Sequence, residues 1–473
     1  MSIASKYKNL PVAVKASLWY LLANILVNGI SFFTVPIFSR VLSMEYYGRF
    51  TLYTSWVSFI TIFSTLNLFM GVYPKGLIKF SQFKEKYVGA MQMLTALITV
   101  VVMLAFIIGR NLFEKILGLP IDILILMLFQ ILMVSGINFW STRLRFEYKY
   151  VAFVIASVIM GIGTPIVNLL AVYFLPKNQD TVIYSLAVYQ ISVGAIFFLR
   201  NLRGASFKGI AEYWKFALKM NIPLVPFYLS QIALDQLDRI MISHYLGEAS
   251  VALYNIPYQL SMAMTIITSA ISNSFVPTLY DNMKKGTERK MRKYQNVILI
   301  IIGVGCLVLC IMAPELLRIL APPKYAHAVY VIPPVIIGAY LKYNINIINN
   351  IEFYYEKPRL SMYAAMCAAA LNFILNVLFI PTFGYVSAGY TTMVSFLFSL
   401  LLHVLFIKKL KYDSAIDIRS LLLITTIVSI MVLSIQVLYT MTILRYSIIL
   451  LLILVLAINY RKFLPVVSML KKL

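Results

Sequence analysis

The chain has 473 residues, of which 61% are hydrophobic and 12% are charged, and its net charge is +24. Soluble domains are about half apolar and about a quarter charged, so this composition excludes a soluble globular protein and indicates an integral membrane protein. The positive charge does not indicate nucleic-acid binding, because the sequence has no separate basic domain that could carry such a site.

About fourteen apolar segments follow one another, each long enough to cross a bilayer, which takes roughly 20 residues. The sequence therefore predicts an all-α polytopic membrane protein with about 14 transmembrane helices. The predicted spans are 16–38, 50–73, 88–109, 121–141, 151–175, 182–199, 217–246, 251–280, 294–314, 328–350, 361–381, 384–407, 420–440 and 444–464.

The basic residues indicate the topology. About 30 of the 41 Lys and Arg residues lie in every second gap between the spans, counting the N-terminal tail as the first gap. Short loops rich in Lys and Arg stay in the cytoplasm, so both termini are expected to be cytoplasmic. The first apolar segment is too long for the apolar region of a cleaved signal, and we expect it to be a permanent span.

Two short matches indicate an internal repeat. The segment Arg40–Phe50 resembles His244–Tyr254 at an offset of 204 residues, and Asn168 corresponds to Asn376 at an offset of 208. Parallel repeats around a site near the membrane midplane are typical of transporters. The predicted organisation is an N-terminal six-helix lobe, a C-terminal six-helix lobe, and two additional helices with the tail, at 1–204, 205–411 and 412–473.

The seventh predicted span carries the charges that the topology does not explain: Lys219, Asp235, Asp238 and Arg239. A charge at the bilayer centre costs about 2.5–3.5 kcal/mol on insertion scales, so such residues face a cavity or a partner. Asp235 and Arg239 are four residues apart and can pair on one helical face. Asp238 then has no obvious partner in the sequence. These acidic groups either bind substrate or an ion, or pair with a basic residue elsewhere and lock two helices.

Other spans carry uncharged polar residues at helical spacing: Asn24 and Asn28 in the first, Asn255, Gln259 and later Asn273 in the eighth, and an amide-rich face around Lys342 in the tenth. Each of these could serve only interhelical hydrogen bonding. Together they favour a hydrated central cavity that suits a polar cargo such as an oligosaccharide.

Four basic residues are expected at or near that cavity, and they would attract phosphate or acidic sugars. They are Arg40, Lys219, Arg239 and Lys342. For Arg40, and for Arg49 nearby, the alternative is that the side chain snorkels to lipid headgroups at the outer interface.

The sequence predicts neither a cofactor nor a metal site. It has no Gly-rich phosphate-binding loop of the P-loop kind, no Ser/His/Asp arrangement and no cluster of metal ligands, and His327 and His403 are isolated. The three cysteines lie inside apolar spans without partners at ligand spacing. We therefore expect no catalytic residues and no enzyme activity.

Three groups of residues resemble motifs of Wzx-type polysaccharide flippases, which belong to the superfamily of multidrug, oligosaccharidyl-lipid and polysaccharide exporters. The resemblance rests on Leu234 to Ile242 with the following Tyr245-Leu246-Gly247, on Asn372 to Asn376 with Ile380-Pro381 and Thr391-Thr392, and on Pro36, Arg40, Leu42, Gly48 and Phe50. The chain departs from the family pattern at Ser387-Ala388-Gly389-Tyr390, which puts little in doubt.

The resemblance implies two six-helix lobes around a central cavity, followed by two extra C-terminal helices. It also implies that an undecaprenyl-pyrophosphate-linked oligosaccharide unit crosses the bacterial cytoplasmic (inner) membrane by alternating access, for surface polysaccharide such as O-antigen. Coupling to a proton or sodium ion and contacts with polysaccharide-assembly proteins would follow. Two alternatives remain open. One is a drug/ion antiport exporter of the same superfamily, and the other is a polysaccharide polymerase or ligase, which typically needs a long external loop.

Overall fold

The computed structural model describes residues 12–176 and 178–458, apart from a number of side chains in its first and last helices. Throughout these ranges the regular secondary structure is helical and no strand occurs. The chain divides into two compact units, Met1–Ile240 and Met241–Leu473. The lobe boundaries at 204/205 and 411/412 rest on the internal repeat, and we retain them as a proposal.

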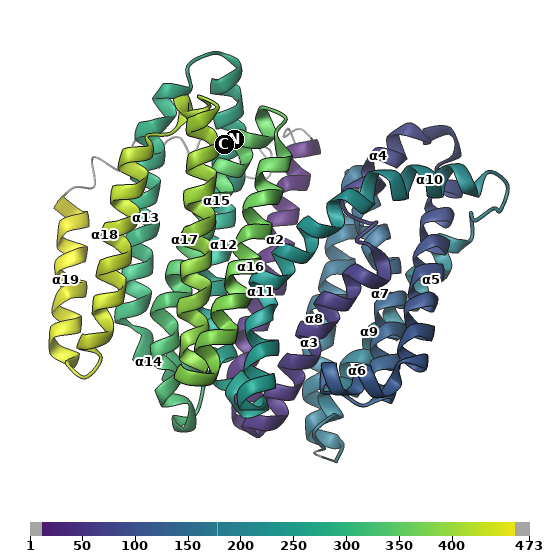
Figure 1. Ribbon diagram of the computed structural model, residues 1–473, viewed down its shortest axis with the longest axis horizontal. Helices are drawn as coiled ribbons and strands as arrows, with labels where there is room; N and C mark the ends of the chain where they lie inside the picture. The colour runs from purple at the N-terminus through teal and green to yellow at the C-terminus, as the bar shows by residue number, and fades with distance from the viewer. Residues whose placement is uncertain (1–11, 177, 459–473) are drawn as a thin grey trace, which may run out of the picture. The chain divides into compact units, whose positions relative to one another are not determined.

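The first unit consists mainly of long helices joined by short turns (Figure 1). Its elements, with η for 3-10 turns, are α2 (Val12–Val41), α3 (Met44–Thr65), α4 (Val72–Lys79), η1 (Ser81–Phe83), α5 (Lys84–Ile108), α6 (Arg110–Leu117), α7 (Ile121–Phe146), α8 (Tyr150–Phe174), α9 (Thr181–Leu202), α10 (Ile210–Asn221), η2 (Ile222–Leu224) and α11 (Val225–Leu246), of which α11 continues into the second unit.

The second unit is built in the same way. Its elements are α12 (Glu248–Lys284), η3 (Glu288–Lys290), α13 (Met291–Ile311), α14 (Ala313–Leu320), η4 (Pro323–Val331), α15 (Ile332–Tyr354), α16 (Pro358–Phe383), α17 (Tyr385–Lys409), η5 (Asp413–Ala415), α18 (Ile418–Ser434), η6 (Ile435–Leu438) and α19 (Thr442–Ile458). Gly247 and Gly384 form the tight turns before α12 and α17, and their φ angles of 83° and 76° favour glycine.

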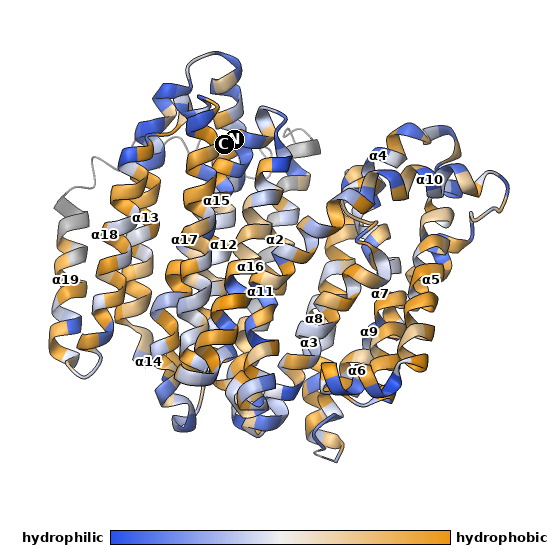
Figure 2. Ribbon diagram, viewed as in Figure 1, coloured by the Kyte–Doolittle hydropathy of each residue, from blue (hydrophilic) through white to orange (hydrophobic). Residues whose placement is uncertain are grey.

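The predicted fold class is confirmed, since the described residues form helices without a strand and every predicted span overlaps at least one helix. Within the described residues, ten helices are both long and apolar enough to cross a membrane. Apolar residues cover the middle of these helices and polar residues gather at their ends (Figure 2). Large apolar side chains such as Ile108 and Ile196 are exposed on the outside. This pattern is what a lipid solvent requires, because hydrocarbon covers such side chains without cost.

The seventh span differs from its prediction. It begins at Val225 rather than at 217, because η2 with Pro223 separates α10 from α11. Proline removes a backbone donor and interrupts a continuous helix. Lys219 therefore lies on α10 and not on the seventh span. Helix α10 is held to α5 by Trp214, whose indole donates to the carbonyl oxygen of Ala90 at 2.8 Å.

Helices α7 and α9 pack with their backbones in close approach. A Cβ atom on Gly136 of α7 would lie 2.4 Å from the backbone nitrogen of Phe198 on α9. A Cβ atom on Gly194 of α9 would lie 2.6 Å from the carbonyl of Met133 on α7. Small residues permit such close contact between membrane helices, where packing is a main source of association energy.

Part of the order of elements in the first unit recurs in the second. An eight-residue helix follows α5 as α6, and another follows α13 as α14. Asn168 on α8 accepts a hydrogen bond from Ser185 on α9 at 2.9 Å. Its counterpart Asn376 on α16 accepts one from Thr391 on α17. Asn168 thus joins α8 to α9, and Asn376 joins α16 to α17.

Candidate functional site

The charged part of α11 makes polar contacts with α3. Arg239 is 3% exposed, and its guanidinium donates to the main-chain oxygen of Asp235 at 2.7 Å and to the amide oxygen of Gln236 at 3.5 Å. The same amide oxygen accepts from the hydroxyl of Ser55 on α3 at 3.1 Å. A buried guanidinium needs such acceptors, because an unsatisfied charge inside a membrane protein is costly.

The two acidic residues of α11 differ in burial. Asp235 is half-buried, and its main-chain carbonyl oxygen accepts a hydrogen bond from Arg239. The four-residue spacing predicts a pair between the two side chains, and this pair stays a prediction. Asp238 is 3% exposed. It has an interaction partner, although none is obvious in the sequence. The two roles expected for Asp238, binding of substrate or an ion and locking of two helices, both stay predictions.

A chain of polar side chains crosses the interior of the first unit. The hydroxyl of Tyr53 on α3 donates to Gln130 on α7 at 2.5 Å, and the Gln130 amide donates to Gln190 on α9 at 2.7 Å. Gln190 in turn donates to Thr164 on α8 at 3.4 Å. Four helices are joined in this way. This chain could not be predicted from the sequence, because uncharged residues on separate spans have no spacing that relates them.

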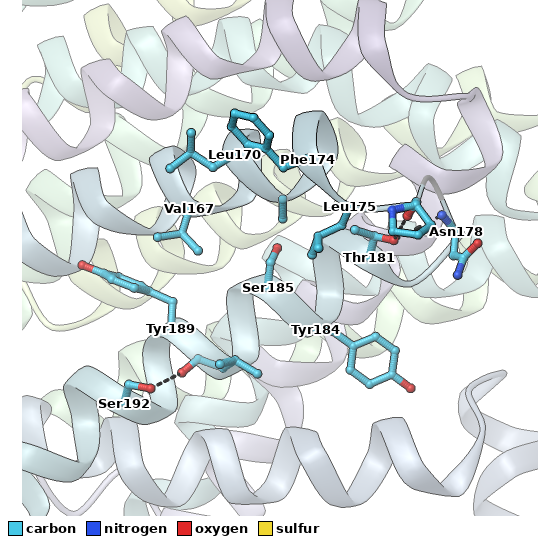
Figure 3. A pocket seen from close by; sticks show the side chains of 13 residues that line it. Val167, Leu170, Phe174, Leu175, Asn178, Thr181, Tyr184, Ser185, Tyr189 and Ser192 are labelled. Carbon is cyan, nitrogen blue, oxygen red and sulfur yellow. Dashed lines mark hydrogen bonds between the residues drawn. The ribbon is translucent and has the colours of Figure 1, made fainter.

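An apolar groove lies between α8 and α9, with a volume of about 690 Å³ (Figure 3). Val167, Leu170 and Phe174 line it from α8, and hydroxyl groups of Thr181, Ser185 and other residues of α9 border it. None of the site residues predicted from the sequence lines this groove. It is a surface for apolar groups rather than for a phosphate.

The arginines at the start of the chain were predicted to lie near the cavity or to reach lipid headgroups. Arg40 is exposed in the last turn of α2, and it donates to the carbonyl oxygen of Pro36 at 2.8 Å. Arg49 is 9% exposed and forms an ion pair with Asp180 at 2.5 Å. The alternative that the Arg49 side chain reaches lipid headgroups is therefore wrong. The side chains of Asn24 and Asn28 lie outside the described residues.

The remaining predicted site residues are dispersed. Lys219 is exposed on α10. On α12, Asn255 is buried, Gln259 is half-buried and Asn273 is exposed. Lys342 on α15 is half-buried, and its ammonium lies 5.9 Å from the centre of the Phe396 ring on α17, within the range of a cation–π contact.

His403 is not isolated, contrary to the prediction from sequence. Its Nδ1 lies 2.8 Å from a carboxylate oxygen of Glu352 on α15, and both side chains are buried. Glu352 lies just past the predicted end of the tenth span, so the sequence does not predict it as an intramembrane charge. Among the described residues, no group of three His, Cys, Asp or Glu side chains could hold a metal ion.

Two family profiles match the chain. The profile of the family described as "Polysaccharide biosynthesis protein" matches residues 13–283, which is more than half of the sequence. The chain belongs to this family. The profile of a second family, MatE, matches residues 223–378 of the same chain.

Two relatives match short segments of this polysaccharide biosynthesis protein. The "Lsg locus putative protein 1" of Haemophilus influenzae is 26% identical over 31% of the chain. An uncharacterized membrane protein of Methanocaldococcus jannaschii is 26% identical over 39% of it. The matched part spans 37% of the length of each relative.

The fold is shared with solved transporters. An inward-facing multidrug resistance MATE family transporter of the MOP superfamily superimposes with a TM-score of 0.62 at 15% identity, covering 84% of this chain and 95% of that one. The lipid II flippase MurJ in an inward closed conformation gives a TM-score of 0.62 at 15% identity, with 94% and 99% covered. The chain therefore has the fold of these transporters, and its apolar helices make it a multi-pass membrane protein.

Proposed function

We propose that the protein is a flippase that moves undecaprenyl-pyrophosphate-linked oligosaccharide units across the bacterial cytoplasmic membrane by alternating access, for surface polysaccharide such as O-antigen. The observation that carries this proposal is the match of the polysaccharide biosynthesis family to residues 13–283 in a chain with a transporter fold. The basic bands support cytoplasmic termini. The protein would act without catalysis, alongside proteins that assemble the polysaccharide.

Cationic side chains on the route would hold the pyrophosphate while polar faces pass the sugars. Lys342 is half-buried, and its ammonium lies 5.9 Å from the centre of the Phe396 ring. A phosphate can therefore compete with the ring for the ammonium group. Arg239 is covered and already bonded to Asp235 and Gln236. It would meet substrate only in a state that uncovers it, and a change of access supplies such a state.

The test compares Lys342→Ala and Arg239→Ala with Lys357→Ala and Arg110→Ala, two exposed basic residues, at matched protein level. Surface polysaccharide is measured in cells, and translocation of the purified lipid-linked oligosaccharide is measured in vesicles. We expect Lys342→Ala and Arg239→Ala to lower both readouts by tenfold or more, while the two controls retain them. Full output from Lys342→Ala and Arg239→Ala would exclude the cationic route.

A second candidate is a drug/ion antiport exporter, which the MatE match over residues 223–378 specifically favours. This function predicts that deletion of the protein sensitises cells to cationic drugs and leaves surface polysaccharide intact. The flippase proposal predicts the reverse. Measuring drug susceptibility and surface polysaccharide on one deletion strain therefore separates the two functions.

A further inference from the structure

The second unit contains a buried acid–base pair that the proposed transport route does not use. Glu352 lies near the end of α15 with no exposed surface, and His403 on α17 is 2% exposed. Nδ1 of His403 lies 2.8 Å from one carboxylate oxygen of Glu352. The hydroxyl of Ser361 on α16 donates to the other carboxylate oxygen at 2.6 Å. Three helices thus meet at one carboxyl group.

The chemistry of this pair requires a proton. A carboxylate buried beside a neutral imidazole carries one uncompensated charge, which is costly in a medium of low dielectric constant. One proton shared by the pair removes that charge, whether it resides on the imidazole or on the carboxyl group. Loss of the proton to water leaves a buried anion held by the Ser361 hydroxyl and by an imidazole that can donate only from one nitrogen.

Other charged groups are too peripheral to replace the proton. Lys342 is ten residues before Glu352 on the same helix, so the two backbone positions are about 15 Å apart along its axis. Other charged and titratable side chains lie in the segments at this end of the helices. They include Tyr280, Asp281 and Lys284 of α12, Glu288 of η3, Arg292 of α13, Tyr354 and Tyr355 at the end of α15, Glu356, Lys357 and Arg359 around the start of α16, Lys408 and Lys409 of α17, and Lys411, Tyr412 and Asp413 before α18. Of these, Tyr280 is bonded to Asn350, Arg292 to main-chain oxygens of Asp413 and Ser414, and Tyr355 is stacked on Tyr412.

We infer that Glu352 and His403 form a proton-binding site, and that its occupancy decides whether α15, α16 and α17 remain packed at this end. With the proton bound, the neutral pair and Ser361 hold the three helices together. When the proton leaves, hydration of the remaining anion favours separation of the helices. An imidazole nitrogen at hydrogen-bond distance fits a proton, whereas hard cations such as sodium prefer a shell of oxygen ligands. If the proposed function holds, the coupling ion is therefore a proton.

The site can be tested without transport, because the chain has three histidines, His244, His327 and His403. Protein labelled with ¹⁵N-histidine in lipid nanodiscs gives ring signals from three histidines, two nitrogens each, and His403→Gln identifies those of His403. We expect Glu352→Gln to change the pH response of the His403 signal. Thr425→Val is the matched control, since it removes a buried interhelical bond to Asn344 that involves neither Glu352 nor His403. Ser361→Ala serves as a second variant that keeps both titratable groups. An identical His403 response in wild type and Glu352→Gln would overturn the site.

The coupling role is tested in vesicles that contain purified lipid-linked oligosaccharide. We expect a pH gradient to accelerate wild-type translocation at least tenfold, a sodium gradient to have no effect, and Glu352→Gln to respond to neither. No wild-type translocation together with a Glu352-dependent His403 signal would reject the flippase proposal and leave the proton site standing. Translocation by Glu352→Gln that still follows the pH gradient would reject the coupling role and leave the flippase proposal intact.

Discussion

Arg49 on α3 and Asp180 in the turn before α9 form an ion pair at 2.5 Å, although 131 residues separate them in the chain. Both side chains are largely covered, with 11% and 15% of their surface exposed. The pair fixes the start of α3 to the connection between α8 and α9. Its removal would leave a guanidinium without its anion in a largely dry place.

We expect Asp180→Asn to lower the free energy of unfolding by about 1.5–3 kcal/mol, the range for hydrogen bonds to charged groups. The measurement is thermal unfolding of the purified protein in detergent. Asp122→Asn is the control at the same end of the unit, because Asp122 accepts a hydrogen bond from the exposed Tyr184 at 2.7 Å. Equal effects of the two substitutions would contradict a special role for the Arg49 pair.

The charge cluster around Glu147 predicts loss of stability in acid. Burial raises the pKa of Glu147, but hydrogen bonds from Lys149, Lys84 and Arg143 outweigh it and lower the pKa to about 2, from an ordinary value of 4.5. A lowered pKa contributes stability that is complete above pH 4.5 and is lost as the pH falls toward 2.

We therefore expect Glu147→Gln to reduce the melting temperature at pH 7, and to reduce the difference in melting temperature between pH 7 and pH 3. Glu212→Gln, on the exposed side of α10, provides the comparison. If Glu147→Gln and wild type lose the same stability on acidification, the cluster does not contribute in this way.

Gly136 tests the close approach of α7 and α9. Gly136→Val places a side chain where the backbone of Phe198 already lies, so we expect a large fall in the yield of monodisperse protein. Gly305→Ala is the control, since its nearest neighbour is the flexible end of Met264 at 3.7 Å. That substitution should be neutral or stabilise the helix by about 0.5–1 kcal/mol. Normal yield for Gly136→Val would show that the two helices can separate readily.

Arg445 joins the last helix to the rest of the second unit. Its guanidinium donates to both carboxylate oxygens of Glu315 on α14 at 2.8 Å, and to the carbonyl oxygen of Ile311 at 2.7 Å. We expect Glu315→Leu alone to destabilise the protein by about 2–3 kcal/mol, because Arg445 is 2% exposed and would lose its anion. The double variant Glu315→Leu/Arg445→Leu should cost less than Glu315→Leu alone. Thermal unfolding of the single and double variants decides this, and additive losses would disprove it.

The helices could be predicted from the sequence, whereas most contacts between them could not. Long apolar segments predict spans because lipid permits little else. The asparagines at 168 and 376, which the repeat relates, each accept a hydrogen bond from the next helix. The break at Pro223 was not predicted as a helix boundary, although proline is a signal for one. Glu352 and His403 lie 51 residues apart on different helices, and neither spacing nor periodicity relates them. Pairing across helices depends on rotation and register, which a hydropathy pattern leaves open.

The glycine contacts between α7 and α9 restrict how the first unit can move. With Gly136 against the backbone of Phe198 and Gly194 against that of Met133, neither helix can slide or rotate past the other without collision. A cycle that changes access must therefore carry this pair along as one rigid body. Cross-linking α7 to α9 should leave transport intact, and a label on either helix should report the same displacement.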